Sequence, residues 1–212
     1  MGHPPITSKP AFIVVTTGTV ACFAGKTGSG KTSVTKALAE CLNWRRVGFG
    51  DYVRAELARR GGNPDDGQEL QDLGQLLVDS DPVSLCRAVL DSVDFRPGDD
   101  ALLDGIRHAT IHQAIVEFVR PSRTCLIYLR AADDLRGLRA IERGRAEAGR
   151  AETHRVEAEV ATVLPSIADA IVDAAASFST VLLQCLDVLG EFGVNAMLIA
   201  SARQRASSIV SR

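Results

Sequence analysis

Short runs of apolar residues alternate with longer stretches of helical periodicity along most of the chain. Residues 19–24 (TVACFA) are apolar and have no polar face, which is typical of a strand that is covered on both sides. Similar short runs predict further strands at 46–49, 101–104, 124–129 and 170–172. Because helical stretches separate these strands, the pattern predicts a parallel sheet with helices on both of its faces.

Residues that favour helix starts and stops divide the helical stretches. Asp81 is suited to cap a helix whose first turn contains Pro82, and Gly61 with Gly62 ends the stretch that precedes Asn63. Helices are therefore predicted at 31–42, 52–60, about 63–78, about 82–93, 110–119, about 133–149, 152–164 and 181–189, and after Gly193.

Composition and charge disfavour several classes of function. The 212 residues are 46% hydrophobic, which is enough for a single domain with a buried core. The net charge of −2, from 24 basic and 26 acidic residues, disfavours a protein that coats duplex nucleic acid. The aromatic content of 5% provides few platforms for stacking a long single strand.

The cysteines and histidines follow no metal-binding or disulfide pattern. The five cysteines include no CxxC pair, so neither a disulfide framework nor a structural zinc site is expected, and a cytoplasmic location fits best. His108, His112 and His154 do not lie at metal-ligand spacing from any cysteine. We expect these histidines at the surface or supporting the site indirectly.

The apolar segment at residues 11–24 follows Lys9 and has features of a targeting signal. It is too short to span a bilayer comfortably, and a signal peptide would require cleavage near Ala24, directly before a glycine-rich loop. We therefore expect its second half to be a buried strand. Residues 1–18, with three prolines, are expected to form a loose N-terminal arm.

Residues 25–32 (GKTGSGKT), here called the phosphate loop, match the pattern G-x-x-x-x-G-K-[ST] between a predicted strand and a predicted helix. Glycines let the backbone curl so that its N–H groups point at phosphate oxygens, and the helix N-terminus adds partial positive charge. The pattern assigns nucleotide binding to Gly25, Lys26, Thr27, Gly28, Ser29, Gly30, Lys31 and Thr32.

Two residues of the phosphate loop have specific expected roles. Lys31 is predicted to reach the β- and γ-phosphates, and Thr32 to offer its hydroxyl to Mg²⁺. The alternatives are a chance glycine turn and a dinucleotide site, which needs neither of these side chains. The loop thus predicts a nucleoside triphosphate, and other residues must distinguish a kinase from a switch or a motor.

Two further motifs follow the predicted second and third strands: Gly50-Asp51-x-x-Arg54, and Asp104-Gly105-x-Arg107 after two leucines. With the phosphate loop they resemble the nucleoside monophosphate kinases and the related dephospho-CoA kinases, over roughly residues 19–173. The resemblance implies a P-loop NTPase fold, with three α/β/α layers, a five-stranded parallel sheet and a short helical lid. It also implies ATP and Mg²⁺ as cofactors.

The chain departs from the adenylate kinases within this group. They carry Asp-Gly-Phe-Pro-Arg after the third strand, whereas this chain has Asp-Gly-Ile-Arg-His at 104–108. The long zinc-binding lid is also missing from the sequence. These departures leave the identity of the phosphate acceptor open.

Three charged residues lie at or just past the predicted strand ends: Arg54, Arg107 and Asp104. We expect them at the edge of the parallel sheet where its strands end, which is where ligands bind in such sheets. The planar guanidinium group suits phosphate, and the resemblance implies that both arginines bind the acceptor. Asp104 is expected to hold Mg²⁺ through water or to orient Thr32. The alternatives are a solvated helix face for Arg54 and a turn or cap role for Asp104.

Asp51 has three interpretations. If the acceptor group is a hydroxyl, the carboxylate could take its proton, as in dephospho-CoA and polynucleotide kinases. If the acceptor is a phosphate, no base is needed, and Asp51 would order Mg²⁺ from its outer shell. The third interpretation is a helix N-cap.

A third group of basic residues lies in the charged stretch at 133–149 and just beyond it. Its positions 136, 139 and 143 share one helical face. The resemblance implies a short lid over the transferring phosphate, with Arg139 and Arg143 catalytic and with hinges at Gly144 and Gly149. The alternative is a salt-bridged surface helix. The arginines of this group are Arg136, Arg139, Arg143, Arg145 and Arg150.

Together these features predict a kinase that moves the γ-phosphate of ATP to a nucleotide-like acceptor, most simply a (deoxy)nucleoside monophosphate. A dephospho-CoA-type or other hydroxyl kinase and a regulatory ATP-binding protein with little turnover are the alternatives. We expect no duplex nucleic acid or membrane partner, and a monomer or homodimer.

The expected organisation has three parts: an arm at 1–18, a kinase domain at 19–190 and a helical tail at 191–212. Within the kinase domain we expect acceptor-binding helices at about 51–95 and a lid at about 133–152.

Overall fold

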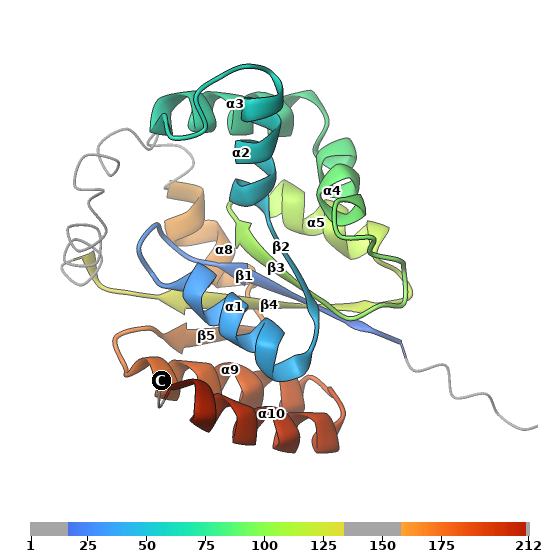
Figure 1. Ribbon diagram of the computed structural model, residues 1–212, viewed down its shortest axis with the longest axis vertical. Helices are drawn as coiled ribbons and strands as arrows, with labels where there is room; N and C mark the ends of the chain where they lie inside the picture. The colour runs from blue at the N-terminus through green and yellow to red at the C-terminus, as the bar shows by residue number, and fades with distance from the viewer. Residues whose placement is uncertain (1–16, 134–157, 211–212) are drawn as a thin grey trace, which may run out of the picture.

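Five parallel strands form one sheet, in the order β2-β3-β1-β4-β5, in the computed structural model, which describes residues 17–133 and 158–210 (Figure 1). This sheet confirms the parallel α/β architecture predicted from the alternation of apolar runs and helical stretches. The strands are β1 (Thr19–Ala24), β2 (Arg45–Gly48), β3 (Ala101–Ile106), β4 (Arg123–Arg130) and β5 (Ala170–Asp173).

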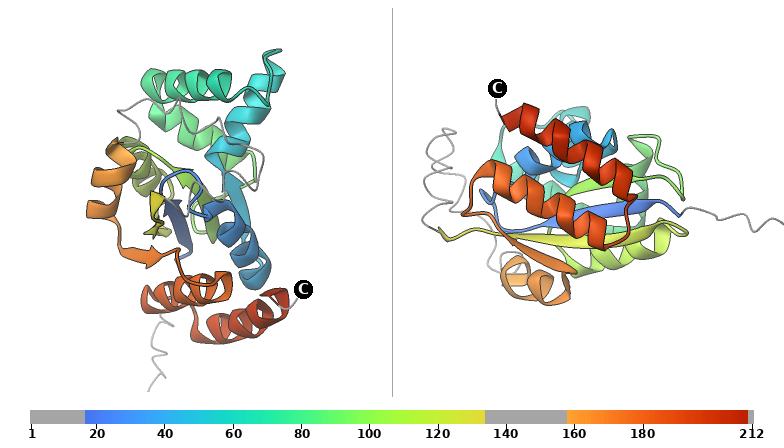
Figure 2. Two further views of the ribbon diagram at one scale, coloured as in Figure 1. Left: turned by 90° about the vertical axis from the view of Figure 1, so that its left-hand side faces the viewer. Right: turned by 90° about the horizontal axis from the view of Figure 1, so that it is seen from below.

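Alternate residues of the central strand β1 pack on opposite faces of the sheet, as expected for a strand that is covered on both sides. Ala21 and Phe23 belong to one buried cluster, and Val20 and Cys22 belong to the other. Helices therefore form a layer on each face (Figure 2). The first face is covered by α1 (Lys31–Leu42), α9 (Phe178–Glu191) and α10 (Ala196–Val210), and the second by α4 (Pro82–Asp91), α5 (Ala109–Phe118), the π-helical turn η1 (Glu159–Val163) and α8 (Leu164–Ile167).

Two helices, α2 (Phe49–Arg59) and α3 (Gly67–Ser80), lie beyond the β2 edge of the sheet (Figure 1). They pack on each other through a small apolar cluster of Val53, Leu57 and Leu73. Phe49 at the start of α2 belongs to the second sheet cluster, so the two helices extend from that face of the sheet as a wall beyond its edge.

Some element boundaries differ from the predictions for local reasons. Helix α2 begins at Phe49 rather than at 52, because the extended Gly48 caps it and the Phe49 ring is buried in the second cluster. Strand β3 continues to the fully buried Ile106. Asp81 caps α4 as predicted, by accepting from two backbone N–H groups. The predicted helix at about 133–149 and the start of that at 152–164 lie outside the described residues, apart from the first position.

The C-terminal helix α10 shares the core of the first sheet face. Ile199, Ala202 and Ala206 are buried in the same cluster as residues of α1 and α9. Residues after 190, which the sequence analysis sets apart as a tail, therefore contribute to the core of the fold. No helix within the described ranges combines the length and the apolar character that a membrane span requires.

Candidate active site

The candidate site lies where the neighbouring strands β1 and β3 end side by side. Phe23 pairs with Asp104 and Ala24 with Ile106, so the phosphate loop leaves β1 next to Asp104. From β1 the chain runs to β2 and β3 on one side of the sheet and then to β4 on the other. Such a reversal opens a crevice at the carboxyl ends of parallel strands, which is where ligands bind in this class of fold.

The phosphate loop has a left-handed backbone conformation, which favours glycine, at Gly25, Gly28 and Gly30. Gly25 has a φ of +143°, and a Cβ there would lie 2.5 Å from the carbonyl oxygen of Leu129. Gly30 has a φ of +93° and caps α1 without any side-chain hydrogen bond. The first N–H groups of α1 therefore face the loop without a capping side chain, which is the usual geometry of a phosphate-binding helix N-terminus.

The Lys31 ammonium group lies across the phosphate loop. Its Nζ donates to the carbonyl oxygens of Gly25 and Lys26, at 2.6 and 2.9 Å. This position places a positive charge beside the curled backbone and the N-terminus of α1. The arrangement is suited to binding a chain of phosphates, as the sequence predicts.

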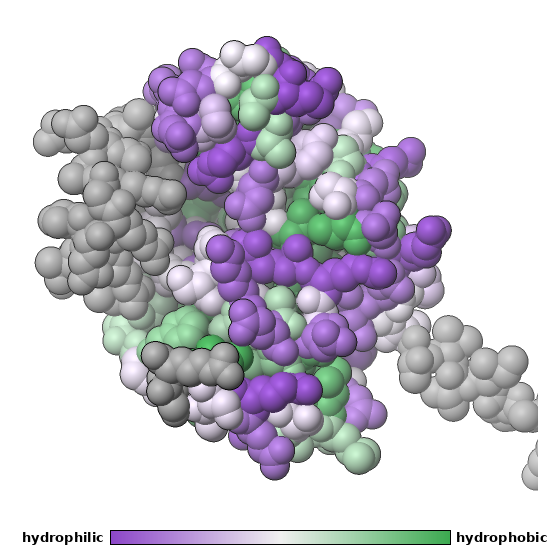
Figure 3. All heavy atoms as spheres, viewed as in Figure 1, coloured by the Kyte–Doolittle hydropathy of each residue, from purple (hydrophilic) through white to green (hydrophobic). Residues whose placement is uncertain are grey.

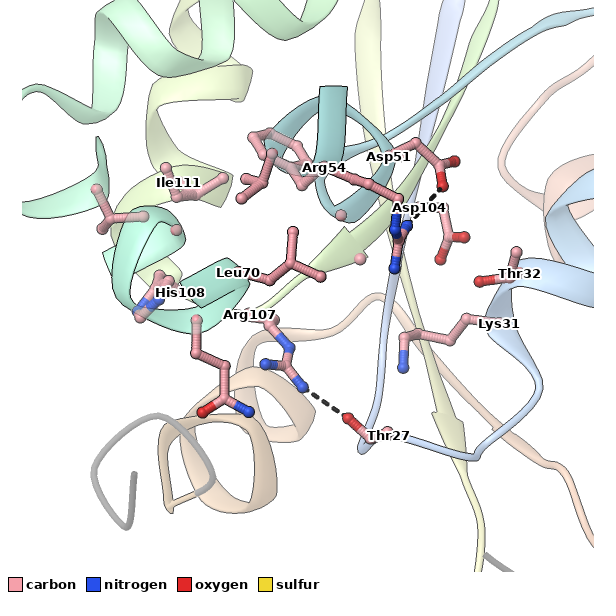
Figure 4. Close-up of a pocket in the computed structure, with 18 of the residues that line it drawn as sticks. Thr27, Lys31, Thr32, Asp51, Arg54, Leu70, Asp104, Arg107, His108 and Ile111 are labelled. Carbon is pink, nitrogen blue, oxygen red and sulfur yellow. Dashed lines mark hydrogen bonds and ion pairs between the residues drawn. The ribbon is translucent and has the colours of Figure 1, made fainter. Parts of the chain in front are cut away.

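A cavity of about 600 Å³ opens beside the phosphate loop and continues to α2 and α3. Thr27, Lys31 and Thr32 line its loop end, and Leu70 and Ile111 line the opposite end (Figure 4). On the face drawn in Figure 3, hydrophilic side chains predominate, and apolar ones show both between the α2–α3 end and the middle of the molecule and at the end formed by α9 and α10. One cavity thus contains the predicted donor residues and a more apolar compartment.

Asp104 combines burial with an unsatisfied oxygen. Only 4% of the residue is exposed, and its Oδ2 accepts a 2.6 Å hydrogen bond from Nη2 of Arg46. Its Oδ1 is buried and has no hydrogen-bond partner within the described part of the chain. Asp104 and Thr32 line the same cavity (Figure 4). A carboxylate and a hydroxyl beside a phosphate site are the oxygen ligands that Mg²⁺ uses with nucleotides, so these residues fit the predicted ion.

The described residues contain no complete metal-binding cluster of their own. No group of three or more His, Cys, Asp or Glu side chains in residues 17–133 and 158–210 is arranged to hold an ion. A nucleotide-bound Mg²⁺ does not require such a cluster, because phosphates and water supply most of its ligands.

Asp51 lies in the first turn of α2 and lines the cavity. Its Oδ2 accepts from Nη1 of Arg46 at 3.0 Å, and its Oδ1 lies 3.8 Å from Nη1 of Arg54. The N-cap interpretation of Asp51 is wrong, because α2 starts earlier than predicted and Gly48 is its N-cap. A Cβ on Gly48 would lie 2.7 Å from Asp51 Oδ2, so this glycine leaves room for the carboxylate.

The two predicted acceptor arginines lie at different places in the cavity. Nε of Arg54 donates to the carbonyl oxygen of Pro64 at 3.2 Å, which ties α2 to the turn before α3. Nη2 of Arg107 donates to Oγ1 of Thr27 at 2.7 Å, within the phosphate loop (Figure 4). Arg54 thus lies at the α2–α3 end of the cavity, and Arg107 lies beside the phosphate loop.

Two further residues contact the site, Arg46 and Glu159, and neither is among the residues predicted from the sequence. Oε2 of Glu159 lies 3.1 Å from Nδ1 of His108, and its Oε1 accepts from the N–H of Ala109 at 2.6 Å. His108 lines the cavity, so it supports the site rather than lying free at the surface. Neither residue carries a local sequence signal, because the contacts that place it at the site join positions far apart in the chain.

The predicted lid lies outside the described residues. Arg139 and Arg143, with Arg136, Arg145 and Arg150, fall within 134–157. Their predicted catalytic role therefore stays a prediction.

Comparison with protein families gives a match that covers more than half of the chain. A family model described as an AAA domain matches residues 24–159, from the end of β1 to the start of η1. The chain belongs to this AAA domain family. The matched range contains the phosphate loop, Asp51, Asp104 and both predicted acceptor arginines.

Solved structures share the fold of this AAA domain. A shikimate kinase from Acinetobacter baumannii, in complex with shikimate, has a TM-score of 0.57 and 13% identity, over 85% of this chain and 97% of that chain. A shikimate kinase from Aquifex aeolicus vf5 has a TM-score of 0.55 and 16% identity, over 82% of this chain and 98% of that chain. A comparison with curated proteins found no match. The AAA domain therefore has the P-loop NTPase fold that small kinases use, as the sequence predicts.

Proposed function

We propose that this AAA domain is a phosphotransferase that moves the γ-phosphate of ATP to a nucleotide-like small molecule, most simply a (deoxy)nucleoside monophosphate. One observation carries the proposal: the phosphate loop and Arg54 line a single cavity of about 600 Å³. Direct transfer requires donor and acceptor in one enclosed space, with the reacting atoms in line. The likeness to the two shikimate kinases supports a kinase but not this choice of acceptor.

At the donor end, the chain provides charge and hydrogen bonds for a triphosphate. Lys31 and the N-terminus of α1 bind phosphate oxygens and stabilise the charge that moves during transfer. Thr32 and Asp104 would hold Mg²⁺. When bound, that ion neutralises charge on the β- and γ-phosphates.

At the acceptor end, the character of the wall favours a nucleobase over a polyol. Sugar hydroxyls placed against aliphatic side chains would lose hydrogen bonds to water without replacement. A nucleobase has apolar faces and a polar edge. An amide side chain can both donate hydrogen bonds to such an edge and accept hydrogen bonds from it. The wall contains two amides, Gln71 and Gln75, among the aliphatic residues Val53, Leu70, Val78, Leu85 and Ile111.

A hydroxyl acceptor is the second candidate, because Asp51 lines the cavity and carries a carboxylate that could take a proton. The contacts of Asp51 with Arg46 and Arg54 support the phosphate acceptor instead. They engage both oxygens of the carboxylate with cations. A regulatory domain with little turnover is the third candidate.

An acceptor screen tests the proposal. ATP labelled at its γ-phosphate is incubated with the protein, Mg²⁺ and separate nucleoside monophosphates, nucleosides, dephospho-CoA, shikimate or gluconate. We expect the label in a nucleoside diphosphate, and no transfer by the Lys31→Ala variant. Transfer to a hydroxyl compound would support the second candidate, and ATP binding without transfer to any compound would support the third.

The buried cysteines support a reducing location for this reaction. All five are free and buried in the structure. Burial raises the pKa of the Cys86 and Cys125 thiols to about 12, which disfavours the reactive thiolate. Free thiols are typical of a reducing compartment, so we propose a cytoplasmic location for the protein.

A further inference from the structure

Arg46 connects three elements of the candidate active site through one guanidinium group. From β2, its Nε donates to Oγ1 of Thr35 in α1 at 2.9 Å. Its Nη1 donates to Asp51 in α2 at 3.0 Å, and its Nη2 to Asp104 in β3 at 2.6 Å. Only 13% of the side chain is exposed, and Arg46 is not among the residues that line the cavity. It therefore touches the residues of the site without contacting the space where a ligand would lie.

We propose that Arg46 is a positioning residue, which holds Asp104 and Asp51 in the geometry that receives a metal–nucleotide complex. This inference rests on the proposed function, because it assigns Asp104 and Thr32 to the metal. Residues that bind a metal ligand without touching the metal orient that ligand and tune its affinity for the ion.

The contact with Asp104 determines which carboxylate oxygen is available. Arg46 binds Oδ2, while Oδ1 is buried and has no hydrogen-bond partner among the described residues. A buried carboxylate oxygen without a partner is costly, so an oxygen left in this way indicates a missing ligand. With Oδ2 fixed by Arg46, the plane of the carboxylate is fixed, and Oδ1 is the atom left for a hydrated cation.

Through Thr35, Arg46 also contacts the segment that holds Thr32, the second residue assigned to the metal ion. Oγ1 of Thr35 accepts from Arg46 and donates to the carbonyl oxygen of Thr32 at 3.2 Å. Thr35 is fully buried, so the link is shielded from water. Arg46 thus bears on the position of Thr32 and on that of Asp104, the two groups between which the ion would lie.

A purely structural role explains these contacts less well. A buried ion pair is weak evidence for stability, since apolar replacements are often as stable. Lysine could not reproduce the contacts either, because its ammonium is a point charge and the fork of Arg46 reaches three acceptors. The neighbouring Arg45 provides a matched control on the same strand. It pairs with Asp99 at 2.7 Å, is half exposed and does not line the cavity.

Manganese binding tests the inference without relying on turnover. Mn²⁺ replaces Mg²⁺, and electron paramagnetic resonance measures its binding to the full-length protein with ADP, in wild type, Arg46→Lys and Arg45→Lys. Circular dichroism melting confirms that each variant is folded. We expect Arg46→Lys to weaken Mn²⁺·ADP binding about 10- to 100-fold, and Arg45→Lys to change it by less than about twofold. Metal-free ADP should bind all three proteins alike, because the phosphate loop is unchanged.

The outcomes separate this inference from the proposed function. If wild type binds Mn²⁺·ADP and folded Arg46→Lys binds it equally well, Arg46 has no positioning role, although the proposed function stands. If wild type binds no Mn²⁺·ADP, the proposed function fails and the inference fails with it. If Arg46→Lys does not fold, Thr35→Val removes the Nε contact together with the hydrogen bond from Thr35 to Thr32, and leaves the contacts of Arg46 with Asp51 and Asp104 in place. Unchanged Mn²⁺·ADP binding by that folded variant would contradict the inference, and weakened binding would support it.

Discussion

Nη2 of Arg107 donates a 2.7 Å hydrogen bond to Oγ1 of Thr27, which joins the end of β3 to the phosphate loop (Figure 4). Arg54, the other predicted acceptor arginine, is instead tied to Pro64 beside α3. The two side chains line the same cavity but make their contacts at different places in it. Their substitution should therefore have different effects on the reaction.

We expect Arg54→Ala to raise the KM for the acceptor while the affinity for ATP stays nearly constant. Arg107→Ala should lower kcat and weaken ATP binding as well, because it also removes the contact with Thr27. Each lost charge-assisted contact should cost about 1.5–3 kcal/mol in kcat/KM. Steady-state kinetics with both substrates varied measure these effects. Loss of ATP binding in Arg54→Ala with an unchanged acceptor KM would show that the acceptor end is wrongly placed.

Asp51→Asn separates the two kinds of acceptor. For a phosphate acceptor, kcat should fall only a few-fold, because no proton needs to be removed. For a hydroxyl acceptor, it should fall about 10²–10⁴-fold, the usual effect of losing a general base. A pre-steady-state transfer rate with the best acceptor from the screen distinguishes these results, with the exposed Asp65→Asn as a control. A fall of about a thousandfold would contradict the phosphate acceptor.

Gly74 is predicted to control the size of the acceptor. It lies inside α3, lines the cavity and has no left-handed φ, and a Cβ there would meet only Val53, at 3.9 Å. Gly74→Ala should therefore raise the unfolding free energy by about 0.5–1 kcal/mol, because alanine favours helix. The added methyl group should at the same time narrow the acceptor end of the cavity.

Acceptor titration and thermal melting together test this prediction. The KM for purine monophosphates should rise more than that for pyrimidine monophosphates, at a cost of about 1–3 kcal/mol in binding. Gly67→Ala, on the same helix but with open space around it, is the control. The ratio of the KM for purine monophosphates to the KM for pyrimidine monophosphates is then compared between the two variants. Equal changes of this ratio in Gly74→Ala and Gly67→Ala would show that Gly74 does not contact the acceptor.

Much of the fold and the position of the phosphate loop between β1 and α1 could be predicted from the sequence, because they depend on local patterns. The phosphate loop is a continuous motif between a strand and a helix, and the apolar runs indicate strands without knowledge of their partners. Arg46 could not be found in this way. Its contact with Asp104 spans 58 positions and depends on the pairing of β2 with β3.

Two other features needed the three-dimensional arrangement. Glu159 approaches His108 across 51 positions, so neither residue shows a local signal for the contact. The place of Gly74 in the cavity wall follows from how α3 packs on α2. The start of α2 was predicted too late because the buried Phe49 extends the helix toward the sheet.

His112 should make stability depend on pH. Burial lowers the pKa of its imidazole from the ordinary value of 6.5, with a weaker opposing effect of Asp169, and its Nε2 is buried without a partner among the described residues. The unfolded chain therefore binds a proton more readily than the folded protein. The unfolding free energy should be highest above pH 6.5 and fall as the pH drops through the folded-state pKa.

Urea unfolding of wild type and His112→Leu between about pH 8 and about pH 5 measures this effect. The variant should be at least as stable as wild type at neutral pH, because it removes an unpaired buried nitrogen. It should also lose less stability on acidification. If the unfolding free energies of the two proteins depend on pH in the same way, His112 is not the group responsible for the pH dependence.

The proposed function requires that one cavity holds both the donor and the acceptor. A bisubstrate compound, with two nucleosides joined through a polyphosphate, tests it most directly by calorimetric titration of wild type, Lys31→Ala and Arg54→Ala. We predict that wild type binds this compound more tightly than ATP or a nucleoside monophosphate alone, and that each substitution weakens its binding. Binding no tighter than that of ATP, and unaffected by Arg54→Ala, would contradict the account.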